Sequence, residues 1–271
     1  MTDSRYHPVD GLSVEVRGAV LRLQLDRPAA RNAIDDTMMA GLIEAVDTAG
    51  RDEGVRAIHL SGAGDHFCGG ADIVARNSGD QPRPRVGAIQ RRLPSQAHLL
   101  LPLLCSVQVP VVCAVRGWAA GIGLQIATAA DFTVAATDAR FWEPFSARGF
   151  TPDSGATWLL PRAIGVARAR EMLLLGRQVD GTEAEEWGLV HRAVPAPEVD
   201  QLSDELAATL AGGPTVALGL TKWLLHAGTS VPLVDQLRNE GLALELSSRS
   251  EDFREGLGAF RDHRPPDFQG R

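Results

Sequence analysis

Two glycine-rich segments, residues 62–73 and 116–127, constrain this chain more than any other feature of its sequence. Each follows a short apolar run that is typical of a β-strand, and the second leads into an apolar, helix-forming segment. Glycines allow sharp backbone turns, and the first amides of a helix are free to bind an anionic oxygen. Two such loops can direct their amides at one oxygen, so the pair predicts an oxyanion hole.

The pattern around these segments predicts an α/β fold. Residues 12–16 and 20–25 alternate apolar and polar positions around Arg17 and Gly18, as expected of a β-hairpin. Helices and strands then alternate: a helix that begins near Asp35, a strand at 55–60, a helix at 86–105, a strand at 109–116, a helix at 122–130 and a strand at 132–135.

After Pro152 the pattern changes, because helical periodicity dominates and strands nearly vanish. We therefore expect an α/β core over residues 1–200 and a helical region over residues 201–271. One apolar helix face fits burial against another subunit and would equally fit a core within the chain. Its residues are Leu233, Val234, Leu237, Leu242 and Leu246.

Composition narrows the function classes. With 271 residues, 44% of them hydrophobic, the chain can bury a large core. No uncharged apolar run reaches the roughly 18–20 residues of a membrane span, and the polar residues 1–11 contain no secretory signal. Three cysteines without metal-ligand spacing indicate a reducing cytoplasm. The net charge of -7 disfavours a nucleic-acid partner.

Other common catalytic signatures are absent from the sequence. There is no G-x-S-x-G nucleophile turn, no G-x-x-x-x-G-K phosphate loop, no G-x-G-x-x-G motif completed after a strand and no clustered His/Cys set for a metal. The sequence therefore predicts neither a metal site nor a dinucleotide cofactor.

Four motifs in order resemble those of the enoyl-CoA hydratase/isomerase (crotonase) superfamily, and the match runs from about Ala19 to Arg264. Residues 67–73 resemble its F-C-x-G-A-D-[IL] loop, and residues 117–123 resemble its G-x-A-x-G-x-G helix start. Residues 27–34 resemble the R-P-x-x-x-N-A-[LI] coenzyme A loop, and residues 184–190 resemble the A-x-x-x-G-L-V signature.

The resemblance implies a spiral of ββα turns and an acyl-CoA thioester as substrate. It also implies that the C-terminal helices pack against other subunits in a homotrimer or hexamer. Coenzyme A would be part of the substrate, so no separate cofactor is expected. Its phosphates need cations, and because Lys222 is the only lysine, arginines must supply them. The cluster of Arg83, Arg85, Arg91 and Arg92 fits a solvated loop better than a phosphate clamp.

Carried over by motif position, the oxyanion donors would be the backbone amides of Ala71 and Ile122. The branched side chain of Ile122 replaces the glycine that is common there and restricts the backbone. Asp72 and Asp131 match positions that look architectural. The residues expected to contact the substrate are Arg27, Ala29, Arg31, Ala33, Gly70, Asp72, Ile73, Gly121, Gly123, Gln125, Trp142, Phe145 and Phe150.

The acid–base residues depart from the hydratases of this family, which use two glutamates. Gln125 and Phe145 occupy those two positions. Asp153 instead matches the P-D-x-G stretch of members that shift double bonds, in which an aspartate moves a proton between two carbons. The same residue also fits the N-cap of the following helix. Glu143 is a second candidate acid or base, and a surface position is an equal alternative for it.

Three activities therefore stay open. The first is an enoyl-CoA isomerase with Asp153 as the proton shuttle. The second is a hydratase or other lyase that uses Glu143 or Asp153 with a water molecule, and the third is an acyl-CoA-binding subunit without catalysis. The aromatic residues suggest a hydrophobic acyl tail or ring.

Overall fold

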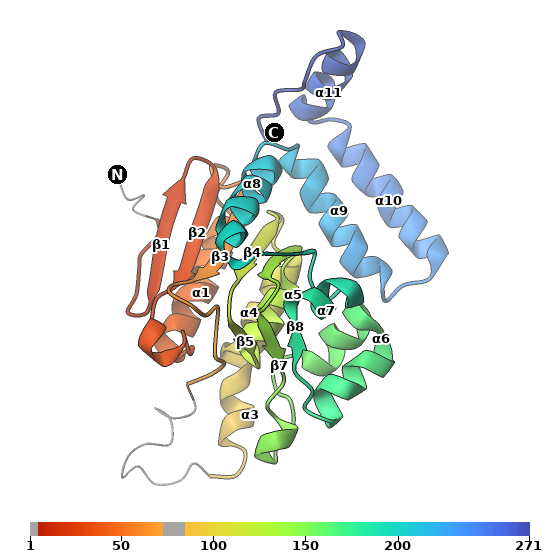
Figure 1. Cartoon of the computed structure of the whole chain (residues 1–271). Helices are drawn as coiled ribbons and strands as arrows, with labels where there is room; N and C mark the ends of the chain where they lie inside the picture. The colour runs from red at the N-terminus through yellow and green to blue at the C-terminus, as the bar shows by residue number, and fades with distance from the viewer. Residues whose placement is uncertain (1–4, 73–84) are drawn as a thin grey trace.

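The computed structural model describes residues 5–72 and 85–271, which form a mixed α/β fold (Figure 1). Its main sheet has six strands, in the spatial order β1 (Leu12–Arg17), β2 (Val20–Leu25), β3 (Ala57–Gly62), β4 (Val111–Val115), β6 (Phe132–Ala136) and β9 (Arg192–Val194). Within this sheet β1 and β2 pair antiparallel, and the other neighbouring strands pair in parallel. All five residues of β4 are buried, as expected of a parallel strand that is covered on both faces.

The N-terminal elements follow the sequence prediction closely. The hairpin pairs Leu12 with Leu25 and Arg17 with Val20, and Gly18 supplies the positive φ of its turn (59°). Helix α1 (Asp36–Ala49) begins where the carboxylate of Asp35 accepts a 2.9 Å hydrogen bond from the amide of Met38. The apolar face of α1, formed by Met38, Leu42, Ala45, Val46 and Ala49, is buried in the core.

The predicted continuous helix over residues 86–105 is wrong. The structure has α3 (Ala88–Arg92), the 3-10 turn η2 (Leu93–Ser95) and α4 (Ala97–Ser106). Pro94 has no backbone N–H to continue the helix, and Gln96 leaves the helical conformation (φ −127°, ψ −115°). The break lets α3 and α4 take different directions.

Strands nearly vanish after Pro152, as predicted: among the described residues, β8 (Val179–Asp180) and β9 are the two that follow it. A second sheet contains β5 (Trp118–Ala120), β7 (Arg140–Trp142) and β8, and β9 lies at one edge of the main sheet. Strands of two or three residues are too short to show alternation in the sequence. The turn after β5 leads directly into α5 (Ile122–Ala129).

The remaining helices divide into two groups in Figure 1. They are α6 (Ala156–Leu174), α7 (Gly181–Trp187), α8 (Val199–Ala211), α9 (Thr215–Gly228), α10 (Leu233–Ser247) and α11 (Glu251–Arg261). Helix α8 packs on the main sheet through Ala207 and Ala211, whereas α9 to α11 project from it. The predicted boundary after residue 200 therefore falls within the first turn of α8, a helix that covers the sheet, and the division into two regions stays a prediction.

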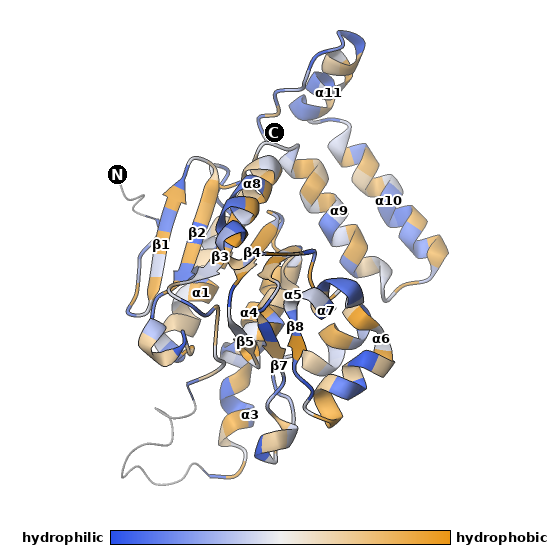
Figure 2. Ribbon diagram, viewed as in Figure 1, coloured by the Kyte–Doolittle hydropathy of each residue, from blue (hydrophilic) through white to orange (hydrophobic). Residues whose placement is uncertain are grey.

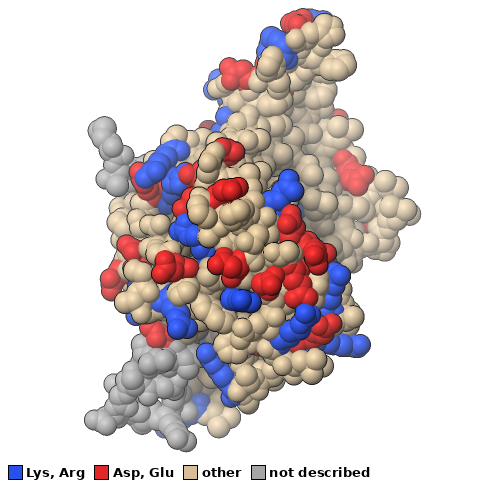
Figure 3. Space-filling model, viewed as in Figure 1, with Lys and Arg blue, Asp and Glu red and all other residues tan. Residues whose placement is uncertain are grey.

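The projecting helices expose an apolar face. Leu233 is 73% exposed and Leu242 is 64% exposed, and Val234, Leu237 and Leu246 are exposed as well. Figure 2 shows hydrophobic residues along α9 and α10, and the surface over α9 is largely uncharged in Figure 3. The alternative that these side chains form a core within the chain is therefore wrong. Within the described residues, no helix combines the length and apolar character that a bilayer crossing requires.

A buried ion pair anchors α9 to the sheet. The ammonium of Lys222 lies 2.7 Å from Oδ2 of Asp131 and 3.4 Å from the carbonyl of Val109. Asp131 also accepts a hydrogen bond from the amide of Val111 (2.7 Å), which fits its predicted architectural role. Burial lowers the pKa of Lys222, and the charge of Asp131 opposes that shift.

We expect Lys222→Ala to lower the free energy of unfolding by about 3 kcal/mol, because it leaves the carboxylate of Asp131 with an uncompensated charge in a largely buried position. Urea unfolding followed by circular dichroism measures the loss. Arg51→Ala is the control, since its ion pair with Asp47 is exposed and should contribute less than about 0.5 kcal/mol. Equal losses in the two variants would contradict the anchoring role of Lys222.

Candidate active site

The two glycine-rich segments meet because they follow neighbouring strands. Strands β3 and β4 are parallel partners, so the loops after them leave the same edge of the sheet. Backbone hydrogen bonds then join the loops: the amides of Phe67 and Cys68 donate to the carbonyls of Arg116 and Trp118, both at 2.8 Å. The amide of Ala120 donates to the carbonyl of Cys68 at 2.9 Å. The two glycine-rich loops therefore lie against each other.

Asn32 holds a third loop, the stretch matched to the coenzyme A loop, against the first segment. It is completely buried and has a left-handed backbone (φ 55°). Its Nδ2 donates to the carbonyls of Ala63 (2.9 Å) and His66 (2.6 Å), and its Oδ1 accepts from the amide of Arg27 (2.8 Å). One side chain thus fixes three backbone positions.

This arrangement turns two amides toward one cleft. The amide of Ile34 donates to the carbonyl of Gly70, and the amide of Asp72 donates to the carbonyl of Ile34, so the N–H of Ala71 between them points the other way. Ile122 is the first residue of α5, where the N–H has no partner within the helix. Both residues line the cleft.

Two glycines are required at these turns. Gly70 has a φ of 110° and Gly121 a φ of 52°, conformations that other residues rarely adopt. Gly123 has a different role and does not line the cleft: a Cβ there would lie 2.6 Å from the Cβ of Cys68, so this glycine lets α5 pack against the first loop.

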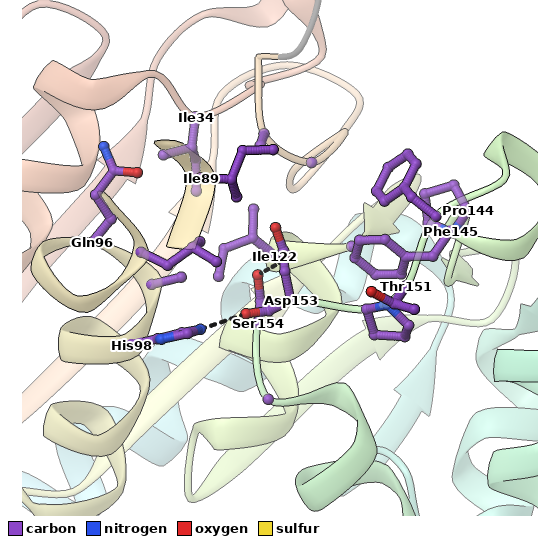
Figure 4. A pocket seen from close by; sticks show the side chains of 18 of the residues that line it. Ile34, Ile89, Gln96, His98, Ile122, Pro144, Phe145, Thr151, Asp153 and Ser154 are labelled. Carbon is purple, nitrogen blue, oxygen red and sulfur yellow. Dashed lines mark hydrogen bonds between the residues drawn. The ribbon is translucent and has the colours of Figure 1, made fainter. Parts of the chain in front are cut away.

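The cleft has a volume of about 870 Å³ and is lined by the two glycine-rich loops, by α3 and α4, and by residues between 144 and 157. Figure 4 shows Ile34, Ile89 and Ile122 on one side of Asp153, and Phe145 and Thr151 on the other. The walls are thus mainly apolar around one central carboxylate, as expected of a small-molecule site.

Asp153 keeps one carboxylate oxygen without a hydrogen bond to the described residues. Its Oδ1 accepts from the hydroxyl of Ser154 (2.7 Å), and Nε2 of His98 lies 2.7 Å from its backbone carbonyl. The N-cap of α6 is Gly155, and no side chain caps that helix end. The alternative that Asp153 caps the helix is therefore wrong, and its Oδ2 can exchange a proton within the cleft.

Aromatic residues shape one wall. Phe145 and Phe150 line the cleft with their ring centroids 5.3 Å apart in a T-shaped contact. Phe145 thus presents a hydrocarbon ring to the cleft. Trp142, expected to contact the substrate, lies outside the cleft lining, because its indole donates to the carbonyl of Gly176 (3.0 Å) and its ring packs on Trp118.

Gln125 and Glu143 form a pair beneath the cleft. Gln125 was expected to contact the substrate, but it is completely buried outside the lining, and its Nε2 donates to Oε1 of Glu143. The alternative that Glu143 is exposed is wrong, because it is completely buried as well. Burial raises the pKa of Glu143 to about 8; the hydrogen bond from Gln125 opposes this rise, and the charge of Asp153 adds to it.

The predicted coenzyme A residues lie apart from this cleft. The guanidinium of Arg27 lies 3.0 Å from the carboxylate of Asp72 and 3.3 Å from that of Asp35, so it holds the loop together. Ala29 and Arg31 are exposed and Ala33 is half-buried, all on the loop that Asn32 holds. Ile73 and Arg83 are outside the described residues.

Three basic residues of the cleft were missed as site residues. His98 and Arg148 belong to no motif, and Arg92 was expected in a solvated loop, yet all three line the cleft. The Nε atom of Arg92 is buried without a hydrogen-bond partner among the described residues. Only the directions of α3, α4 and the 3-10 turn η3 (Ser146–Arg148) bring these side chains together, and the sequence carries no signal for those directions.

Comparison with known proteins agrees with this geometry. The chain belongs to the enoyl-CoA hydratase/isomerase family, whose model matches residues 15–271. It is 38% identical over 257 residues to 1,2-epoxyphenylacetyl-CoA isomerase of Escherichia coli, covering 94% of this chain and 97% of that protein. It is 31% identical over 260 residues to 2,3-dehydroadipyl-CoA hydratase of the same organism, covering 96% and 99%. The crystal structure of an enoyl-CoA hydratase from Bacillus anthracis superposes with a TM-score of 0.90 at 29% identity, covering 96% and 100%.

The raised pKa of Glu143 makes stability depend on pH. Between about pH 4.5 and pH 8 the unfolded chain has released a proton that the folded chain retains, so stability falls as pH rises through this window. Glu143→Gln removes this loss. As pH rises from 5 to 8, we expect the free energy of unfolding of the variant to increase by about 2–4 kcal/mol relative to that of the wild type.

Chemical unfolding of both proteins at several pH values measures this difference. The buried His59, whose pKa burial lowers to about 4, affects both proteins equally and cancels. Parallel curves for the variant and the wild type from pH 5 to pH 8 would mean that Glu143 is ionised in the folded protein.

Proposed function

We propose that this protein binds an enoyl-CoA thioester and shifts its carbon–carbon double bond through an enolate, with Asp153 as the proton shuttle. The observation that carries the proposal is the single free carboxylate oxygen of Asp153 in the cleft that the amides of Ala71 and Ile122 also line. Phe145 supplies no second acid or base to that cleft.

The proposed reaction has two proton transfers and no net change in composition. The thioester carbonyl accepts hydrogen bonds from the amides of Ala71 and Ile122, which stabilise negative charge on its oxygen. Asp153 removes a proton from one carbon of the acyl chain, and the electron pair delocalises into the enolate. The same carboxyl group then returns the proton two carbons away.

The walls of the cleft favour an apolar acyl group, since Phe145, Phe150 and Ile122 line it together with Asp153. Coenzyme A would leave the cleft along the loop that carries the exposed Arg31, and the reaction needs no cofactor beyond it. Names among the relatives include both an isomerase and a hydratase, so the hydration of an enoyl-CoA is the competing outcome of the tests below.

We further propose that copies of this chain form a homotrimer or hexamer through α9, α10 and α11. Support comes from the exposed leucines of α10, which would otherwise remain in water at a cost in solubility. The cysteines are free, which suits a reducing cytoplasm.

The first test incubates the protein with 2-enoyl-CoA and 3-enoyl-CoA thioesters separately in deuterated water. A moved double bond, unchanged composition and deuterium in the acyl chain are the expected result. A product heavier by one water molecule would establish hydration instead, and no turnover of any thioester tried would favour a binding protein.

The second test is Asp153→Asn. We expect kcat to fall by roughly 10²–10⁴ because the amide cannot accept the substrate proton, while affinity for a non-reactive acyl-CoA changes little. Calorimetric binding and isomerisation rates measure the two effects. Ser154→Ala is the matched control: it removes the hydrogen bond to Oδ1 and leaves the carboxylate, so a much smaller loss is expected. Full activity in Asp153→Asn would overturn the proposed role.

A further inference from the structure

The buried pair of Gln125 and Glu143 is the group of titratable and polar atoms that the proposed mechanism does not use. Gln125 comes from the first turn of α5, which carries the oxyanion amide of Ile122, and Glu143 directly follows β7. The two backbones also touch, because the amide of Gly121 donates to the carbonyl of Trp142 at 3.0 Å. The pair thus joins the start of α5 to the strand end that leads into the aromatic wall.

The hydrogen bond within this pair leaves two buried acceptor oxygens without a donor in the described part of the chain. Nε2 of Gln125 donates to Oε1 of Glu143, which leaves Oε1 of Gln125 and Oε2 of Glu143. Both leftover oxygens are buried and have no partner among the described residues. Two acceptors cannot satisfy each other, and buried polar atoms without partners are costly. A proton on Oε2 of Glu143 would turn that oxygen into a donor, and a carboxylic acid with a carboxamide can then form two antiparallel hydrogen bonds.

The electrostatic surroundings also favour that proton. Glu143 is completely buried, and the ionisable group that acts on it from the cleft side is Asp153. No basic side chain among the described residues stabilises its negative form. A carboxyl group without a cationic partner, next to another carboxylate, is expected to stay neutral.

We propose that Glu143 is a positioning residue that acts as a neutral carboxylic acid, doubly hydrogen-bonded to Gln125, to fix the start of α5 and to keep a second negative charge away from Asp153 and the enolate. This inference rests on the proposed function. Glu143 does not line the cleft and does not exchange a proton with the substrate. Its ionisation would break one of the two hydrogen bonds and place a negative charge beneath the site where negative charge develops.

The kinetic test compares pH profiles of Glu143→Gln and Glu143→Leu with the wild type. In the wild type kcat should fall at least about threefold between pH 7 and pH 9, as Glu143 ionises. Glu143→Leu should lower kcat about tenfold or more at every pH with little change in KM, because the pair is lost. Glu143→Gln should restore most of that loss, since two carboxamides can also pair, and its profile should lack the alkaline fall.

Glu53→Gln is the matched control, because Glu53 is exposed and does not line the cleft. Its pH profile should be that of the wild type. An alkaline fall that persists in Glu143→Gln, or a rate in Glu143→Leu equal to that of the wild type, would overturn the positioning role.

A second readout needs no turnover. The infrared spectrum of the wild type should contain a band of a buried protonated carboxyl group that disappears near pH 8, and Glu143→Gln should lack it. If the band is present but no enoyl-CoA is isomerised, the proposed function fails and the neutral state of Glu143 stands. If isomerisation occurs but the band is absent at pH 6, this inference fails.

Discussion

The architecture of the cleft depends on hydrogen bonds that join three loops from distant parts of the chain. Asn32 is central to them, because its carboxamide uses both donor hydrogens and its acceptor oxygen on backbone groups. An isosteric aspartate would have no donors for the carbonyls of Ala63 and His66, and most residues would also resist its left-handed backbone. The amide of Ala71, proposed as an oxyanion donor, is thus placed by bonds that Ala71 does not itself make.

The second amide depends on a different kind of contact. Gly123 lets α5 approach Cys68 closely, and the buried pair below holds the first turn of that helix to the end of β7. Catalytic amides need a fixed direction, since their value lies in being oriented before charge develops. Polar groups buried beneath the cleft therefore serve the site although no substrate reaches them.

Much of the fold and the place of the two glycine-rich segments in the cleft could be predicted from the sequence, because glycine-rich turns and apolar periodicity are local signals. Short strands such as β8 and the position of the helix break near Pro94 could not be predicted, because packing decides where each of these elements begins and ends. The aspartate was found by its motif, whereas its neighbour His98 sits in a helix with no distinguishing pattern. Gln125 was misjudged because sequence position alone does not reveal which side of a helix start faces the substrate.

The hydrogen bond from Ser154 to one oxygen of Asp153 has a stereochemical consequence. With Oδ1 occupied, the proposed reaction requires a single oxygen to accept the proton at one carbon and deliver it at the other. That oxygen lies on one side of the acyl chain, and the chain is held between fixed walls while the enolate exists. Removal and return of the proton would then occur on the same face of the substrate. The carboxylate oxygen that Ser154 leaves free would thus determine the configuration of an isotopically labelled product.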